Sequence, residues 1–221
     1  MSPDDRQPGR EHSGDRRRER GTRSRQLVTR HAVDIASLDG LDGLSFGRLA
    51  DDLDISKAGI QTLFRTKEAL QLATVATAGE AFAEAVLAPA GAEPAGEPRL
   101  RALIARWIDY AAQPLFPGGC FWGANLPIFD SRPGPVRDTL RDQHRGWLNT
   151  LAREFELADR QPPGARDANL AVFQIDAVLN AANIALRFGE ADSVEKVHRV
   201  VDGLLDTEIS HGRGGRGHSA R

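Results

Sequence analysis

The chain has 221 residues and a formal net charge of −2, a length that accommodates one small domain and one larger domain with an ordinary core. No apolar run approaches the roughly 20 residues of a membrane span, and the polar N-terminus is unlike a secretory signal, so we expect a cytoplasmic protein. Cys120 is the only cysteine, which excludes an intrachain disulfide and a Cys-rich zinc site.

The N-terminal segment, residues 1–22, is predicted to be a disordered basic arm because it is rich in Arg, Asp, Gly and Pro and poor in apolar residues. Six Arg and one Glu lie between Arg16 and Arg25, whereas residues 26–72 hold five basic and seven acidic residues. Attraction to an anionic partner is therefore expected from the arm rather than from the segment after it. The alternative is a solubilising leader that contacts nothing.

The segment Ser45–Leu70 has the spacing of a helix-turn-helix. Apolar residues recur at i, i+3, i+4 and i+7 from Phe46 to Leu53, which predicts a short helix with Ser45 as its N-cap. A turn then leads to Ser56, which caps a second helix whose inward residues are Ile60, Leu63 and Phe64. The opposite face of this helix is the face that such a unit presents to the major groove of DNA.

The stretch from about Arg23 to Leu70 resembles the N-terminal domain of TetR-family transcriptional regulators. The resemblance rests on motifs in a fixed order: Ser45 with Leu49-Ala50, then Ile55–Gly59, Phe64 and Lys67–Leu70. The family commonly has a phosphate-contacting Tyr where Gln61 stands. The phosphate contacts of this chain are therefore expected to be rearranged, with Gln61 reading a base edge instead.

The residues expected to contact DNA are carried over onto this chain from that resemblance and from their chemistry: Arg23, Arg25, Ser45, Lys57, Ala58, Gly59, Gln61, Thr62 and Lys67. Ser45 and Lys67 lie at helix N-termini, where phosphate is bound readily. Lys57 suits guanine or a phosphate, and Gln61 has the donor–acceptor pair that fits adenine. The alternative for this face is a solvated helix surface.

The rest of the chain is predicted to be helical, because hairpin signals and β-branched runs are scarce. The fold class expected is all-α, with an N-terminal three-helix helix-turn-helix DNA-binding domain and a C-terminal helical ligand-binding and dimerisation domain. The expected boundaries are residues 23–70 for the first domain, 71–209 for the second and 210–221 for a disordered tail.

The last two long helices, residues 165–188 and 193–209, are expected to form the dimer interface, as they do in TetR-like proteins. The first is apolar around most of its circumference, which predicts burial. The predicted interface residues are Ala177, Ala181, Ile184, Ala185, Val197, Val201, Leu204 and Leu205. The alternative is that this pair only closes the core of the monomer.

The middle of the chain carries a second resemblance. Gly118–Phe121 and Phe129–Arg137 are similar to the C-terminal domains of one TetR subgroup, whose members differ in ligand. Apolar aromatics with a few polar groups are typical of effector pockets. The predicted pocket residues are Trp107, Phe116, Cys120, Phe121, Trp122, Asn125, Phe129, His144, Trp147 and Gln174, although aromatics at helical spacing are more often plain core.

The resemblance implies a homodimeric, ligand-responsive repressor that binds a palindromic double-stranded DNA operator and is released by a small, mostly apolar effector. No cofactor, metal site or catalytic residue is predicted, since no phosphate loop, metal-ligand spacing or catalytic order appears. Two alternatives remain open. One is a redox or electrophile sensor at Cys120, whose place at a helix start would lower its pKa. The other is a helical interaction protein that binds DNA nonspecifically.

Overall fold

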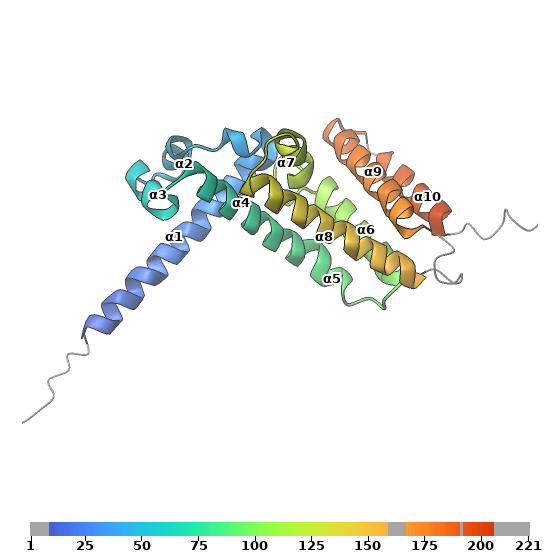
Figure 1. The fold of residues 1–221 in the computed structure, drawn as a ribbon, viewed down its shortest axis with the longest axis horizontal. Coiled ribbons are helices and arrows are strands. Elements are labelled where there is room, and N and C mark those ends of the chain that lie inside the picture. Colours follow the sequence, from blue (N-terminus) through green and yellow to red (C-terminus); the bar gives the residue numbers. More distant parts are fainter. Residues whose placement is uncertain (1–8, 159–166, 191, 206–221) are drawn as a thin grey trace, which may run out of the picture. The chain divides into compact units, whose positions relative to one another are not determined.

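The computed structural model describes residues 9–158, 167–190 and 192–205, and its regular elements in these ranges are all helical (Figure 1). The expected all-α class is confirmed. In chain order the elements are α1 (Gly9–Asp39), the 3-10 helix η1 (Leu41–Gly43), α2 (Phe46–Leu53), α3 (Lys57–Phe64), α4 (Lys67–Phe82), the π-helix η2 (Ala83–Leu87), α5 (Ala88–Ala90), α6 (Glu97–Ala112), α7 (Phe121–Phe129), α8 (Pro135–Ala158), α9 (Ala168–Arg187) and α10 (Ser193–Leu205).

The helices form two compact units, named unit 1 and unit 2 below. Unit 1 holds the residues up to Ala81 together with Phe116–Arg141, and unit 2 holds Phe82–Leu115 together with the residues from Asp142 onward. The division therefore falls inside α4 and α8 rather than at residue 70, where the sequence placed it. The cause is that α7 packs against α1, a long-range contact that no boundary drawn along the sequence reveals.

Helix α1 begins at Gly9, so residues 9–22 are helical and do not form the disordered arm predicted for residues 1–22. Arg and Glu favour helices intrinsically, whereas the compositional signal for disorder reports only a shortage of apolar surface. A segment that continues an existing helix also avoids the cost of nucleation. Residues 1–8 and the predicted tail at 210–221 lie outside the described residues.

The core of unit 1 is built on the second half of α1, where Val28, Ala32 and Ala36 are fully buried at a spacing of four residues. Polar contacts then orient α2 against this helix. The Arg48 Nη1 lies 2.6 Å from the Asp39 Oδ2, and the His31 Nε2 lies 2.9 Å from the Asp52 Oδ2. Exposed pairs contribute at most about 1 kcal/mol each, so the apolar contacts carry most of the stability.

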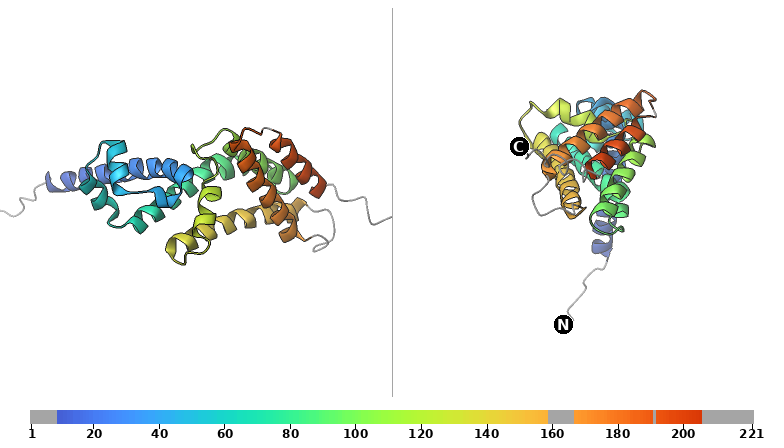
Figure 2. Two further views of the ribbon diagram at one scale, coloured as in Figure 1. Left: turned by 90° about the horizontal axis from the view of Figure 1, so that it is seen from above. Right: turned by 90° about the vertical axis from the view of Figure 1, so that its right-hand side faces the viewer.

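Unit 2 contains α9 and α10 side by side, as Figures 1 and 2 show from several directions. Helix α9 buries Val172, Ile175, Leu179 and Ala182 on one side, and it packs against α6 and α10. Its other side is exposed, so the prediction that this helix is buried all round was wrong. By length and composition alone α9 could cross a membrane, but a single helix with one packed face is weak evidence for that.

Candidate functional site

Two serine caps set the geometry of the α2–turn–α3 unit. Ser45 accepts a hydrogen bond from the Arg48 N–H at 3.0 Å, and Ser56 accepts one from the Gly59 N–H at 3.1 Å. The turn between the helices uses Asp54 in the left-handed region, with φ of 52°, which Asp tolerates better than most residues. Both predicted helix starts are confirmed, and each cap contributes about 1 kcal/mol.

Helix α3 has one buried face and one exposed face. Ile60 is fully buried and Phe64 is 2% exposed, so they anchor the helix in unit 1. The opposite side carries the predicted DNA contacts, which are exposed except for half-buried Gly59: Lys57, Ala58, Gly59, Gln61 and Thr62. The amine of Lys57 and the amide of Gln61 therefore face solvent from one short helix, as base-edge reading requires.

Two further predicted contacts, Arg25 and Lys67, are bound to the backbone around α3. The Arg25 Nη1 donates to the Leu63 carbonyl at 2.8 Å, and its guanidinium lies 4.6 Å from the centre of the Phe64 ring. The Lys67 Nζ donates to the Asp42 carbonyl at 2.7 Å. These side chains hold neighbouring segments of unit 1 together, a role that the sequence did not reveal. Ser45 and Arg23 are exposed.

Asn125, predicted as a pocket residue, instead ties α7 to the end of α1. Its Nδ2 donates to the Ala36 carbonyl at 3.1 Å and to the Phe121 carbonyl at 2.8 Å, and its Oδ1 accepts from the Leu41 N–H at 2.7 Å. The side chain is fully buried. Because both ends of the amide are occupied by backbone partners, Asn125 serves packing within unit 1 and is not available to an effector in this structure.

The predicted pocket aromatics of unit 1 pack against one another. The ring centroids of Phe116 and Phe121 are 6.3 Å apart, and those of Phe121 and Trp122 are 5.6 Å apart, both edge to face. Phe129 lies under the guanidinium of Arg132 at 5.5 Å, and Arg132 forms an ion pair with Asp42. These rings fill the contact between α7 and the rest of unit 1.

Cys120 lies at the start of α7 with a side chain that is 5% exposed. Its Sγ accepts a long hydrogen bond from the Gly123 N–H at 3.5 Å, which makes it the N-cap of the helix. Reactive thiols are partly exposed and lie near cationic groups. Burial to this degree favours a packing and capping role for Cys120 over the sensor alternative.

A second aromatic cluster lies in unit 2. Phe82 contacts Tyr110 and Trp147 edge to face, with centroid distances of 5.3 Å and 5.5 Å. Trp107 lies 6.4 Å from Tyr110. The cluster joins the end of α4 to α6 and α8, and all four rings are buried. Of the four predicted pocket residues that fall in unit 2, Trp107 and Trp147 belong to this cluster.

A polar pair lies one helical turn from that cluster. The His144 Nε2 is 3.2 Å from the Asp176 Oδ1, and both side chains are partly buried. His144 precedes Trp147 by three positions on α8, so the pair forms a polar end to the cluster. Gln174 is exposed on α9 and does not join this group, because the side of α9 that it occupies faces away from the core of unit 2.

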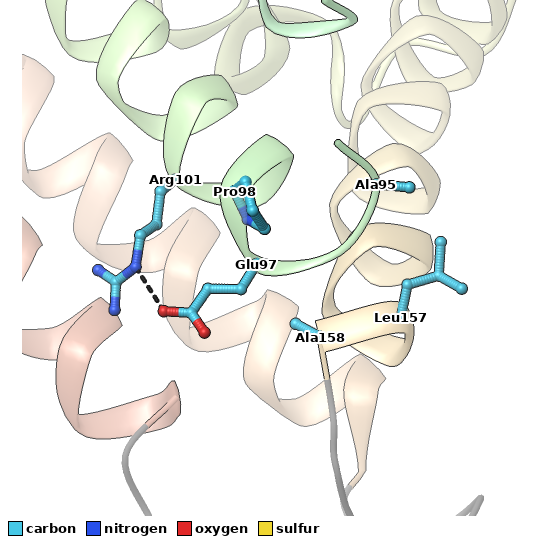
Figure 3. Close-up of a pocket in the computed structure, with 6 residues that line it drawn as sticks. All are labelled: Ala95, Glu97, Pro98, Arg101, Leu157 and Ala158. Atoms are coloured by element: carbon cyan, nitrogen blue, oxygen red, sulfur yellow. Dashed lines mark hydrogen bonds and ion pairs between the residues drawn. The ribbon is translucent and has the colours of Figure 1, made fainter. Parts of the chain in front are cut away.

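A pocket of about 370 Å³ opens where α6 begins and α8 ends (Figure 3), and no predicted effector residue lines it. It is lined by Ala95, Glu97, Pro98, Arg101, Leu157 and Ala158. Arg101 donates to Asp202 at 2.6 Å and to Glu97 at 2.8 Å. These bonds, Asp202 first, raise the pKa of Arg101 above its ordinary value. An arginine held by two carboxylates offers little attraction to an anion.

The exposed side of α9 and the C-cap residue that follows it form a continuous apolar line, named the α9 stripe: Leu170, Phe173, Ala177, Ala181, Ile184 and Phe188. Phe173 is 70% exposed, Ile184 59% and Phe188 81%. Successive spacings of three and four residues place these side chains on one face of the helix. An exposed apolar patch of this kind marks an interaction surface.

The predicted interface residues of α10 differ in how much of each side chain is exposed. Val197 and Val201 are 1% and 2% exposed, so their assignment to a dimer interface was wrong. They lie on the side of α10 that covers α9 within the same chain. Ala185, Leu204 and Leu205 are half-buried. An apolar seam on a helix predicts that the seam is covered, but it does not identify the partner.

Sequence reasoning missed five residues that the structure brings to these surfaces: Phe82, Tyr110, Leu170, Phe173 and Phe188. Tyr110 follows Trp107 by three positions, so the same helical periodicity that selected Trp107 also marks it. Leu170 and Phe173 lie seven and four positions before Ala177, so the same helical spacing extends the predicted interface to them. No sequence signal placed Phe82 beside Trp147, because the contact joins separate helices.

Residues 96–201 match the family model described as Tetracyclin repressor-like, C-terminal domain. No curated protein matches the sequence. Among the residues that the structure describes, no three His, Cys, Asp or Glu side chains are grouped to hold a metal ion.

Solved structures share the fold of this chain over most of their length. SCO4454, a TetR-family transcriptional regulator from Streptomyces coelicolor, is 22% identical with a TM-score of 0.69, covering 84% of this chain and 94% of its own. A TetR transcriptional regulator from Chloroflexus aurantiacus J-10-FL is 21% identical with a TM-score of 0.72, covering 85% and 94%. AibR, solved with isovaleryl coenzyme A and operator DNA, is 19% identical with a TM-score of 0.58, covering 80% and 96%.

Proposed function

Because the chain belongs to the TetR family of transcriptional regulators, we propose that it is a homodimeric repressor that binds a palindromic operator and is released by a small effector. The observation that carries the proposal is the exposed face of α3, where Lys57 and Gln61 project from a helix that buried Ile60 and Phe64 hold in place. Two such helices in a dimer would occupy half-sites about one helical turn apart.

The α9 stripe supports a second copy of this chain as the partner. Phe173, Ile184 and Phe188 are exposed apolar side chains, whereas Ala177 and Ala181 between them allow close approach of another helix. Fully burying one large apolar side chain contributes about 1.5–3 kcal/mol. A two-fold axis would bring the stripe of one protomer onto the same stripe of its partner, so each residue would contribute twice.

The aromatic cluster of unit 2 is the proposed effector site. Phe82, Trp107, Tyr110 and Trp147 supply an apolar wall, and the pair of His144 and Asp176 supplies a polar end. A ligand that separates these packed rings would favour a conformation with a different spacing of the two α3 helices. Its effect on DNA binding equals its difference in affinity for the two conformations.

Acyl-coenzyme A thioesters form the first effector class to test, because AibR binds isovaleryl coenzyme A. An apolar acyl chain suits the aromatic wall in unit 2. The test adds a panel of acyl-coenzyme A compounds of increasing chain length to the operator complex and follows release by fluorescence anisotropy. Release by one chain length and not by free coenzyme A supports this class, and release by none excludes it.

We propose that the protein acts in the cytoplasm, because its proposed partner is DNA, and that it catalyses no reaction. The chain's family consists of transcriptional regulators. The aromatic and polar groups of unit 2 are proposed to bind an effector, which would leave the site chemically unchanged.

Substitution of Gln61 or Lys57 is expected to weaken operator binding without unfolding the protein. A good contact between a side chain and a base edge contributes about 1–3 kcal/mol. Because the dimer would lose this contact at both half-sites, Gln61→Ala should raise the operator Kd by about 30-fold or more. The expected effect of Lys57→Ala is a similar loss, with a smaller salt dependence if its partner is a phosphate. Fluorescence anisotropy with a labelled operator measures both.

Gln113→Ala and Lys196→Ala provide matched controls, since both residues are exposed and lie in unit 2. They should leave the operator Kd unchanged. If both α3 variants bound the operator with wild-type affinity, α3 would not be the recognition helix.

A further inference from the structure

The first half of α1 is a helix without an apolar face. From Gly9 to Gln26 the sequence contains no apolar side chain, and among the residues of α1 whose burial the structure describes, from Glu19 onward, Val28 is the first that is buried. A helix that is polar all round gains nothing from a protein core. The segment Gly9–Thr22, named the basic extension, therefore needs another explanation for its charge and its helical continuation.

Arg25 fixes where the basic extension starts relative to the recognition helix. Its side chain binds the Leu63 carbonyl and covers the Phe64 ring at the end of α3, so α1 passes the recognition helix at this point. Residues before Arg25 continue along the same axis (Figures 1 and 2). At 1.5 Å per residue, Gly9 lies about 24 Å beyond Arg25 along the helix.

The charge of the basic extension complements DNA, and the charge of the helix-turn-helix does not. Residues 26–72 hold five basic and seven acidic residues, whereas Arg16–Arg20 contains four Arg and one Glu. Arg20 and Arg23, whose side chains the structure describes, are exposed. Duplex DNA carries about one negative charge per 1.7 Å of axis, and neutralising these charges releases counterions.

We propose that the basic extension is a helical arm that lies along the phosphate backbone of the duplex outside each half-site. Like charges four residues apart on a helix repel one another, and phosphates would relieve that repulsion. The arm would supply most of the nonspecific, salt-dependent part of the affinity, while α3 supplies the sequence preference. This inference rests on the proposed DNA-binding function and assigns it a second contact surface.

The test measures the salt dependence of operator binding for the full chain and for a variant with Arg16, Arg17, Arg18 and Arg20 all changed to Gln. Each lost phosphate contact reduces the slope of log K against log salt by about 0.9. The expected reduction is about 2 or more, with the preferred sequence unchanged. Thermal unfolding should match the wild type, because the basic extension contributes no buried apolar residue.

A control variant removes the same charge from unit 2, with Arg106, Arg145, Arg153 and Arg199 changed to Gln. All four residues are exposed. A slope that falls only in the basic-extension variant supports the arm. The helical-arm proposal would be overturned if the slope of log K against log salt were the same in both variants and the wild type. It would also be overturned if the slope fell equally in both variants.

The two proposals fail in different ways. If the wild type selects no sequence at all, the repressor proposal fails, and the same slopes measured on random duplex still decide whether the arm binds phosphate. If the wild type selects an operator and the slope is unchanged in the basic-extension variant, only the arm is wrong.

Discussion

Phe173→Glu combined with Ile184→Glu is expected to convert the protein to monomers and to abolish tight operator binding. Both side chains lie on the α9 stripe and are more than half exposed in the single chain. In the proposed dimer both protomers would bury these two side chains, which makes four buried side chains in all. Because each is already partly covered, completing its burial contributes about 1–2 kcal/mol, and the four side chains together contribute about 4–8 kcal/mol.

That loss corresponds to roughly a 10⁴-fold rise in the dimer dissociation constant, before the cost of placing carboxylates in an apolar contact is added. A monomer engages one half-site only, so operator affinity should fall by about 10²-fold or more as the linked second contact disappears. Sedimentation velocity across a concentration series measures the first effect, and fluorescence anisotropy measures the second.

Leu157→Glu is the matched control for the α9 variant, because Leu157 is 56% exposed in the same unit and lies on α8. It should leave the association state unchanged. A doubly substituted α9 variant that remains dimeric would show that the α9 stripe is not the interface, and the partner surface would have to be sought elsewhere.

Gly118→Ala is expected to lower the free energy of unfolding by about 3 kcal/mol, the upper part of the range for overpacked sites. A methyl group at Gly118 would overlap the main-chain carbonyl of Ser37, and backbone atoms cannot rotate away as a side chain can. The Gly118 N–H also donates to the Ser37 Oγ at 2.9 Å. The substitution would therefore separate the start of α7 from α1. Urea unfolding followed by circular dichroism gives the free energy.

Gly146→Ala tests whether this cost belongs to the site or to the loss of any glycine. Gly146 lies inside α8 with no atom near its added methyl group, so this variant should gain about 0.5–1 kcal/mol from helix propensity. If Gly118→Ala were as stable as the wild type, the close packing of α7 on α1 would be contradicted.

Local features of this fold were predictable from sequence because they depend on neighbouring residues. The caps at Ser45 and Ser56 and the buried positions Ile60 and Phe64 follow from spacing and side-chain chemistry. The exposed face of α3 follows from the same pattern, since a short helix that buries one side must expose the other.

Features that depend on contacts between distant segments were not predictable in this way. Asn125 has the composition of a pocket residue, yet its partners Ala36 and Leu41 lie more than 80 positions earlier. The apolar faces of α9 and α10 predicted that these faces are covered. They did not indicate whether the chain's own core or a second copy of the chain covers them. For the same reason Val197 was assigned to the wrong surface, and the exposed Phe173 was missed.

The proposed operator recognition is tested by selecting bound sequences from random duplex DNA with the purified full chain at near-physiological salt. We expect a palindromic motif whose two half-sites are separated by about one helical turn of DNA, and we expect this motif to disappear when Gln61 and Lys57 are both replaced by Ala. Recovery of no enriched sequence, or of the same motif by that double variant, would contradict the proposed operator recognition.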